Sequence, residues 1–249
     1  MNLKDSPEGE GFTPIVVTIN AALSDEVAVS GAAALACNRE PQVVFNGQYP
    51  RHSGFKLTPD EAKDFLSQEP ASADVLFPFL VGQVMLTKDQ PNEWVIDFQR
   101  RNIVDSQVYR LPFQRLTETV LPHIEKLATV ERKRTGKESG QDQNWLRTWW
   151  QHFRCRSEML DAIGDSARYI ACSGVTKRPI FCFVSSGIRA DHALFAFALD
   201  DDYSFGIMQS NAHWQWFVAN CSKFKSDFRY TPESVFDTFP GRKRPPPNS

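Results

Sequence analysis

The chain is organised around the stretch Asn144-Trp-Leu-Arg-Thr-Trp-Trp-Gln-His-Phe-Arg-Cys-Arg156, which holds three of its six tryptophans. Up to Gly164, large apolar side chains recur at the spacing of one helix face, and arginines occupy the opposite face. Asn144 is a residue type that caps helices, and Gly164 is one that ends them. We therefore predict one amphipathic helix over residues 144–164. Such a helix is most often a core element with a solvated back, so its function depends on the sequence around it.

The tryptophan stretch closes a basic block. Residues 99–156 hold 12 Lys and Arg against 6 Asp and Glu, although the whole chain has a net charge of −2. A basic block is usually a solvated face, but a surface that follows a phosphate backbone needs the same residues. The candidate phosphate contacts are Arg100, Arg101, Arg132, Lys133, Arg134, Arg147 and Arg154.

Short apolar runs with turn residues between them follow the stretch. They predict strands at 168–172, 180–184, 194–198 and 205–208, and then a helix over 211–221. Before the stretch, we expect strands at 15–19 and 94–98 and a helix that starts at Thr58-Pro-Asp-Glu61. Pro78 argues against a central strand in the run 75–82. The predicted fold class is mixed α/β (α+β), a short mixed sheet with flanking helices.

Length and composition exclude several classes of protein. The 249 residues are 41% hydrophobic, which is enough for a large core. No apolar run approaches the roughly 20 residues of a membrane span, and no secretory signal opens the chain. The five cysteines form no Cys-x-x-Cys pair, which favours reduced thiols in a cytoplasm over a disulfide framework or a zinc ribbon.

Eight motifs in a fixed order resemble a known family. They are Phe77-Pro-Phe-Leu-Val-Gly82, Trp94-Val-Ile-Asp-Phe98, the Trp149-Trp150 pair with its arginines, Tyr169-Ile-Ala171, Phe205-Gly-Ile-Met-Gln-Ser210, His213-Trp-Gln-Trp216, Arg229-Tyr-Thr231 and Phe236-Asp-Thr-Phe-Pro240. The family is the C-terminal target-recognition region of MmeI-like (type IIG/IIL) single-chain restriction–modification enzymes, which are adenine-N6 DNA methyltransferases. The resemblance implies a lead-in from a missing methyltransferase domain at 1–72, a DNA target-recognition domain at 73–240 and a disordered basic tail at 241–249.

The resemblance also implies partners and cofactors. The expected partners are double-stranded DNA and a methyltransferase domain or subunit. In the full enzymes that domain carries a Gly-rich cofactor loop and an Asn-Pro-Pro-Tyr motif, and this chain has neither. We therefore expect no catalytic residue, no metal site and no cofactor in this chain, while S-adenosylmethionine is implied for the missing catalytic domain.

Two loops that follow predicted strands supply polar side chains for reading bases. Arginine and lysine pair with guanine, and asparagine and glutamine pair with adenine. The second loop leads into a predicted helix, whose free N–H groups also suit a phosphate. Ordinary turn and cap chemistry is the alternative for both loops. The candidate base-reading residues are Ser173, Thr176, Lys177, Arg178, Gln209, Ser210, Asn211 and His213.

Two other functions stay open. The first is a non-catalytic subunit that docks on a methyltransferase, with the acidic residues 1–98 as the docking face; these hold 14 Asp and Glu against 6 Lys and Arg. The second is an independent enzyme. Ser185-Ser186-Gly187 with Asp191-His192 would be its best nucleophile site, but the Gly-x-Ser-x-Gly elbow is missing.

Overall fold

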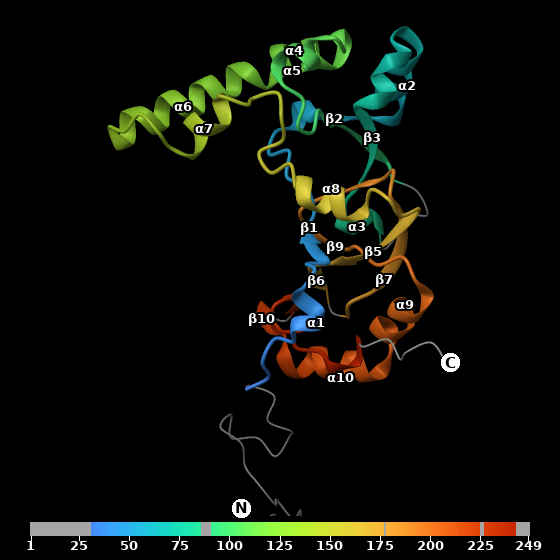
Figure 1. Ribbon diagram of the computed structural model, residues 1–249. Helices are drawn as coiled ribbons and strands as arrows, with labels where there is room; N and C mark the ends of the chain where they lie inside the picture. Colours follow the sequence, from blue (N-terminus) through green and yellow to red (C-terminus); the bar gives the residue numbers. More distant parts are fainter. Residues whose placement is uncertain (1–30, 86–90, 177, 225–226, 243–249) are drawn as a thin grey trace, which may run out of the picture. The chain divides into compact units, whose positions relative to one another are not determined.

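The computed structural model describes residues 31–85, 91–176, 178–224 and 227–242 (Figure 1). Contacts within the chain define two compact units, Met1–Ala33 and Ala34–Ser249. The domain boundaries predicted after residues 72 and 240 stay predictions. The strand predicted at 15–19 and most of the predicted tail lie outside the described residues.

The described strands form three sheets (Figure 1). Sheet 1 has the order β1-β9-β5-β7, and all its pairs are antiparallel. Sheet 2 has the order β2-β4-β3-β8, in which only β3 and β8 run parallel. Sheet 3 is the small antiparallel group β10-β11-β6. The strands are β1 (Val44–Asn46), β2 (Lys56–Leu57), β3 (Leu76–Leu80), β4 (Glu93–Ile96), β5 (Arg168–Ser173), β6 (Val175–Thr176), β7 (Phe181–Ser185), β8 (Arg189–Ala190), β9 (Leu194–Phe197), β10 (Ser222–Phe224) and β11 (Asp227–Arg229).

Helices and strands both contribute to the fold, with α4 to α8 following one another and β5 to β9 coming next, so the fold class is mixed α/β (α+β) as predicted. The helix expected at Thr58 begins there: the Thr58 side chain accepts from the Glu61 N–H, and Glu61 returns a bond to the Thr58 backbone. The helices are α1 (Ala36–Arg39), α2 (Pro59–Gln68), α3 (Gly82–Met85), α4 (Ile103–Gln107), α5 (Arg110–Thr119), α6 (Leu121–Thr135), α7 (Gln141–Leu146), α8 (Ser157–Ile163), α9 (Asp202–Gln209) and α10 (Asn211–Asn220), with 3-10 turns η1 (Ser53–Phe55), η2 (Pro70–Asp74) and η3 (Pro240–Arg242).

Strand β5 separates two of the three apolar cores. Its side chains alternate between the faces of sheet 1, because successive residues of a strand point to opposite sides. Ile170 and Cys172 join the core that contains Phe217 of α10, and Tyr169 and Ala171 join the core that contains α8. Both faces are therefore buried, which explains why the strand reads as a continuous apolar run.

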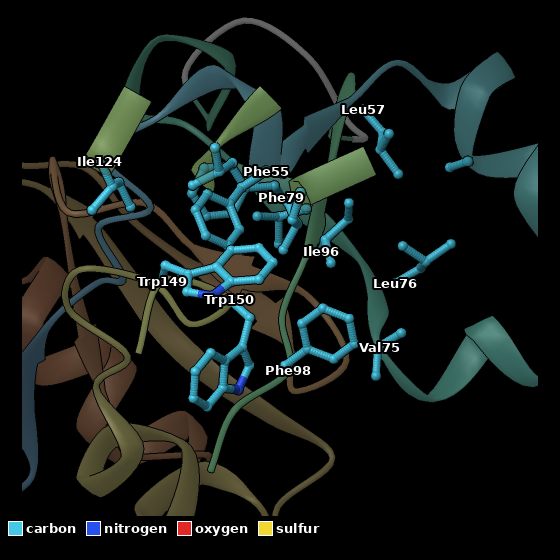
Figure 2. Packing of buried hydrophobic residues seen from close by; sticks show 14 of the residues in the cluster. Phe55, Leu57, Val75, Leu76, Phe79, Ile96, Phe98, Ile124, Trp149 and Trp150 are labelled. Carbon is cyan, nitrogen blue, oxygen red and sulfur yellow. The ribbon is translucent and has the colours of Figure 1, made fainter. Parts of the chain in front are cut away.

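The third core contains the three tryptophans of the tryptophan stretch. Figure 2 shows Trp149 and Trp150 packed beside Phe98, Phe55 and Phe79, so side chains of the tryptophan stretch cover sheet 2. Trp150 also donates its indole N–H to the Arg101 carbonyl at 3.0 Å. The sequence correctly placed these side chains in the core.

The tryptophan stretch is not one helix, however. It forms α7 and α8, and an irregular segment between them pairs with Tyr49: the backbone N–H groups of Tyr49 and Arg154 each donate to the other's carbonyl at 3.1 Å. Helix α7 begins at Gln141, three residues before the predicted cap, because the Glu131 carboxylate accepts from the first backbone N–H groups of α7. These bonds lower the pKa of Glu131, and the bond from the Gln143 N–H has the largest effect.

Two further local expectations are wrong. Residues 205–208 lie inside helix α9, because the Asp201 side chain caps this helix by accepting from the Ser204 N–H at 2.9 Å. The run around Pro78 forms β3, which is an inner strand of sheet 2. Its neighbour β8 pairs only with Phe79 and Leu80, so pairing on that side begins after the proline and needs no N–H from it.

A buried ion pair joins sheet 2 to the tryptophan stretch. The Asp97 carboxylate is fully buried and accepts from Arg189 Nε at 3.2 Å and from Gln48 Nε2 at 3.0 Å. Gln48 Nε2 also donates to the Cys155 carbonyl at 2.8 Å, and the Arg189 guanidinium lies over the Phe77 ring. One carboxylate thus fixes β8, the segment after β1 and the loop before α8.

The first and last described segments of the larger unit are bonded to each other. The Leu35 N–H donates to the Asp237 carbonyl at 2.8 Å. The buried Asn38 side chain donates to the carbonyls of Phe236 and Phe239 at 3.0 and 2.9 Å. This Asn38 clamp holds α1 beside the C-terminal turns.

Candidate nucleic-acid interface

A cleft of about 710 Å³ receives side chains from all three sheets. We call it the main cleft. Sheet 1 contributes Asn46 and Ser173, sheet 2 contributes Lys56 and Glu93, and sheet 3 contributes Arg229. The segment between β8 and β9 adds Asp191 and His192.

The wall of the main cleft between β5 and β6 is held by backbone bonds. The Gly174 N–H donates to the Ala193 carbonyl at 2.9 Å, and the Gly174 carbonyl accepts from the Tyr230 N–H at 3.0 Å. A Cβ on Gly174 would lie 3.2 Å from the Phe195 ring, so a larger residue would crowd this turn. Strand β6 then pairs with β11 in a register that sets Arg229 opposite Val175. This pairing fixes the position of the exposed Arg229 in the cleft wall.

The main cleft offers both hydrogen-bond donors and acceptors. Lys56 Nζ lies 2.7 Å from Glu93 Oε2, and His192 Nδ1 lies 3.0 Å from Asp191 Oδ1. The His192 ring also packs on Tyr49, with 4.3 Å between ring centroids. Arginine, lysine and asparagine side chains match the acceptors on base edges, while carboxylates match the amino groups of cytosine and adenine. The polar side chains of the main cleft can therefore bind a flat surface that presents both donors and acceptors, such as a base-pair edge.

The first predicted reading loop borders this cleft in part. Ser173 lines it, and its hydroxyl donates to the Val175 carbonyl at 3.1 Å. Thr176 belongs to β6, while its side chain and all of Lys177 lie outside the described residues. Arg178 is exposed, and its guanidinium lies 5.1 Å from the centre of the Trp214 ring. The loop therefore contributes Ser173 to the cleft and directs Arg178 toward α10.

The second predicted loop does not line the main cleft. Gln209 donates to the Phe181 carbonyl at 2.9 Å, and Ser210 caps α10 by accepting from the His213 N–H at 3.2 Å. These are the cap and turn roles that the sequence left as the alternative. Asn211 is exposed at the start of α10.

His213 is a core residue. Its side chain is 1% exposed and lies among Phe181, Phe239 and Tyr230, whose hydroxyl is 3.3 Å from Nε2. Burial lowers the pKa of His213 to about 4, so the imidazole is neutral at neutral pH. The prediction that His213 contacts a base edge conflicts with this burial, since no part of the ring is open to a groove.

The candidate phosphate contacts fall into three places. Arg132, Lys133 and Arg134 are exposed at the end of α6, which stops at Gly136 with a φ of 64°. Arg147 and Arg154 are exposed between α7 and α8, where Arg154 lies over Phe153. Arg100 pairs with Asp161 at 2.7 Å, and Arg101 lies over Tyr109. Glu131, in the same basic run, points inward and caps α7.

Several residues of the main cleft were missed from the sequence. Asn46, Lys56, His192 and Arg229 lie in four separate segments and come together only through strand pairing. Arg229 had one usable signal, because it stands in the Arg-Tyr-Thr motif next to the buried Tyr230. Alternation along a strand then exposes the residue beside a buried one.

Comparison with known proteins gives a family and related solved structures. The family model described as "MmeI, target recognition domain" matches residues 24–243. A solved structure of the type IIL restriction–modification enzyme MmeI in complex with DNA is similar, with a TM-score of 0.63 and 18% sequence identity. The similarity covers 95% of this chain and 30% of the enzyme chain. No curated protein matches this sequence.

Proposed function

Because this chain belongs to the MmeI target recognition domain family, whose members are the DNA sequence-recognition modules of restriction–modification enzymes, we propose that its main cleft reads base edges of duplex DNA. The exposed side chain of Arg229 carries this proposal. It is held on β11 by pairing with β6, in the wall of a cleft that also contains Ser173, Asn46 and Lys56. An arginine held on a sheet approaches guanine in a fixed direction, which base readout requires.

The basic residues of α6 and the α7–α8 segment complete the proposed surface. Lys133, Arg134 and Arg147 are exposed, and phosphate contacts of this kind set the register of a protein on DNA without reading sequence. We propose that these residues and the other predicted phosphate contacts hold the backbone while the cleft reads bases. Arg178 and Asn211 stay candidate readers, since both are exposed near the start of α10.

A binding selection on randomised duplexes tests this division of roles. Removing a base contact with Arg229→Ala should relax the preference at one base pair by about 1–3 kcal/mol. Lys133→Ala should weaken all sequences alike. If about four phosphates are contacted, log K should fall with log salt at a slope near −3.6. Arg110→Ala is the matched control, because Arg110 is an exposed arginine outside the cleft and outside the candidate set.

Two outcomes of this selection contradict the proposal. Binding that does not change with salt would exclude a phosphate-tracking surface. Equal base preferences in the parent and the Arg229→Ala variant would remove the main cleft as the reading site.

We further propose that a methyltransferase region acts together with this chain. The chain spans 30% of the length of the MmeI chain it resembles, and its sequence lacks the Asn-Pro-Pro-Tyr motif of the adenine-N6 enzymes. S-adenosylmethionine would then bind to that region and not to this chain. Methyl transfer to DNA by the purified chain, above a boiled control, would contradict this proposal.

Helix α4 is the best candidate for contact with such a region. Val104 and the C-cap residue Val108 are each 68% exposed and lie four residues apart, next to the partly exposed Ile103. Exposed apolar side chains that gather in this way are typical of protein–protein contacts. This observation favours the docking role as a second function, compatible with DNA reading.

A further inference from the structure

A second cavity, of about 430 Å³, adjoins the main cleft. We call it the side cavity. Asn46 and Phe195, which pair with each other in β1 and β9, line both spaces, so the two are neighbours. The other polar side chains of the side cavity are Gln42, Arg156, Glu158 and Glu233. None of these four was predicted to contact DNA.

Arg156 is the unusual residue of the side cavity. Its backbone is left-handed, with a φ of 54° and a ψ of 47°, a conformation that costs free energy for a residue with a Cβ. Although Arg156 is the N-cap of α8, its side chain makes no capping bond. Neither the backbone nor the helix cap therefore needs an arginine, and glycine or asparagine would adopt this conformation more easily.

The backbone around Arg156 is held firmly in place. Arg154 pairs with Tyr49, and the Cys155 carbonyl accepts from Gln48, which is itself bonded to the buried Asp97. On the other side, the Arg156 carbonyl accepts from the Leu160 N–H at 3.1 Å. A Cβ on Gly47 would lie 2.1 Å from the Asp191 carbonyl oxygen, so only glycine lets β1 lead into this arrangement.

The guanidinium of Arg156 has unused hydrogen-bonding capacity. Its Nε is buried, and among the described residues it has no hydrogen-bond partner. Among the residues that the structure describes, no ion pair links Arg156 to Glu158 or Glu233, although all three line the side cavity. The buried Nε is not open to a ligand, so the outer part of this half-buried guanidinium, held at the wall of the side cavity by a strained backbone, is the part that can meet one.

The neighbouring carboxylates define which ligand fits. A phosphate beside Arg156 would meet the negative charges of Glu158 and Glu233, which disfavours it. A guanine–cytosine pair presents two acceptors on guanine, which arginine bonds, and one amino donor on cytosine, which a carboxylate accepts. The mixed charge of the side cavity thus matches a base-pair edge better than a phosphate.

We infer that the side cavity is a second base-reading subsite and that Arg156, with Glu158 or Glu233, specifies a G·C pair next to the pairs read in the main cleft. This inference rests on the proposed DNA-reading function of the main cleft. Arg156 would act as a specificity-determining residue and Asp97, through Gln48 and Cys155, as its positioning residue.

The test is a binding selection on randomised duplexes with the full chain and three variants. Arg156→Gly removes the side chain and relieves the positive φ, so its melting temperature should equal or exceed that of the parent. It should reduce discrimination at one G·C pair by roughly ten- to a hundred-fold and leave the other positions unchanged. Arg156→Lys keeps the charge but loses the planar fork, so it should lose most of the same discrimination. Glu158→Gln should relax the preference at the same pair if Glu158 accepts from cytosine, and should leave it unchanged if Glu233 does.

Each result decides between the alternatives. Unchanged preferences in both arginine variants would overturn the inference while leaving the main cleft intact. Equal weakening on every sequence would make Arg156 a phosphate contact. If Arg156→Gly fails to fold, Arg156→Lys alone decides, because it retains the parent's backbone and charge. A parent chain without any base preference would overturn the proposed function itself, and this inference with it.

Discussion

The regions around sheet 1 and sheet 2 solve the same problem, a buried polar side chain, in opposite ways. Sheet 2 buries the Asp97 carboxylate and matches it with a second charge on Arg189. The core beside sheet 1 buries His213, whose lowered pKa keeps it neutral between aromatic rings. The free energy of burying a charge depends on its partner, and the free energy of burying a neutral base depends on pH. Removal of the partner should therefore have its largest effect at Asp97, and a change of pH should act on His213.

The largest expected effect is at Asp97. Asp97→Ala leaves the Arg189 guanidinium buried without its carboxylate, which typically costs about 3–5 kcal/mol of unfolding free energy. The double variant Asp97→Leu with Arg189→Met removes both charges and should recover most of that loss. Urea unfolding of the three proteins at pH 7 measures both quantities. A single variant within about 1 kcal/mol of the parent would show that the ion pair is not needed for stability.

The second effect is the pH dependence of stability, to which the buried His213 contributes. An unfolded histidine binds its proton near 6.5, and His213 in the folded chain binds it only near 4. Between these values the unfolded state holds more protons, so the unfolding free energy falls as the pH is lowered, by about 3 kcal/mol over the window. Burial also lowers the pKa values of His152 and His52, which adds to the slope in the same direction.

A His213→Gln variant measures how much His213 contributes to the pH dependence of the unfolding free energy. Its unfolding free energy should depend less steeply on pH between about 6.5 and 4, while the contributions of His152 and His52 remain. Thermal melts at several pH values in that window provide the comparison. Parallel pH profiles for the parent and the variant would mean that His213 titrates normally in the folded protein.

The smallest effect compares two helix caps, one in each region. Thr58 caps α2 and Ser210 caps α10, each through a side chain that accepts a backbone N–H. Replacing either with alanine should cost about 1 kcal/mol. Ser210→Ala should also leave every base preference unchanged, because its hydroxyl already donates to the Ile207 carbonyl at 2.7 Å. A change in base preference would restore Ser210 as a reader.

Local patterns in the sequence predicted what depends on near neighbours. The Thr58 capping box, the apolar strand β5 and the buried tryptophans all follow from residues within one or two turns of chain. The break between α7 and α8 follows from Tyr49, which lies 105 residues before its partner Arg154. No local pattern of apolar residues contains that contact, so periodicity alone predicted a single helix.

The same reason explains which site residues were found. Ser173 stands at the end of a predicted strand, where polar residues are conspicuous. Arg229 and Arg156 contribute to their cavities only after β6 pairs with β11 and Tyr49 pairs with Arg154. Gln209 and Ser210 looked similar in composition to readers, yet each forms a hydrogen bond that supports its own loop. Composition identifies polar loops, and only strand pairing shows which of their residues line a cavity and which cap a helix.

The Asn38 clamp has a consequence for protein engineering. Because residues 35–38 are bonded to residues 236–239, the segment between them enters and leaves at nearly the same point. Domains whose ends lie together can be inserted into a loop of another protein without stretching either chain. Residues 35–239 should therefore be moved between proteins as one unit. Moving only a part that contains β1 but not β9 would separate these paired strands and open both cavities.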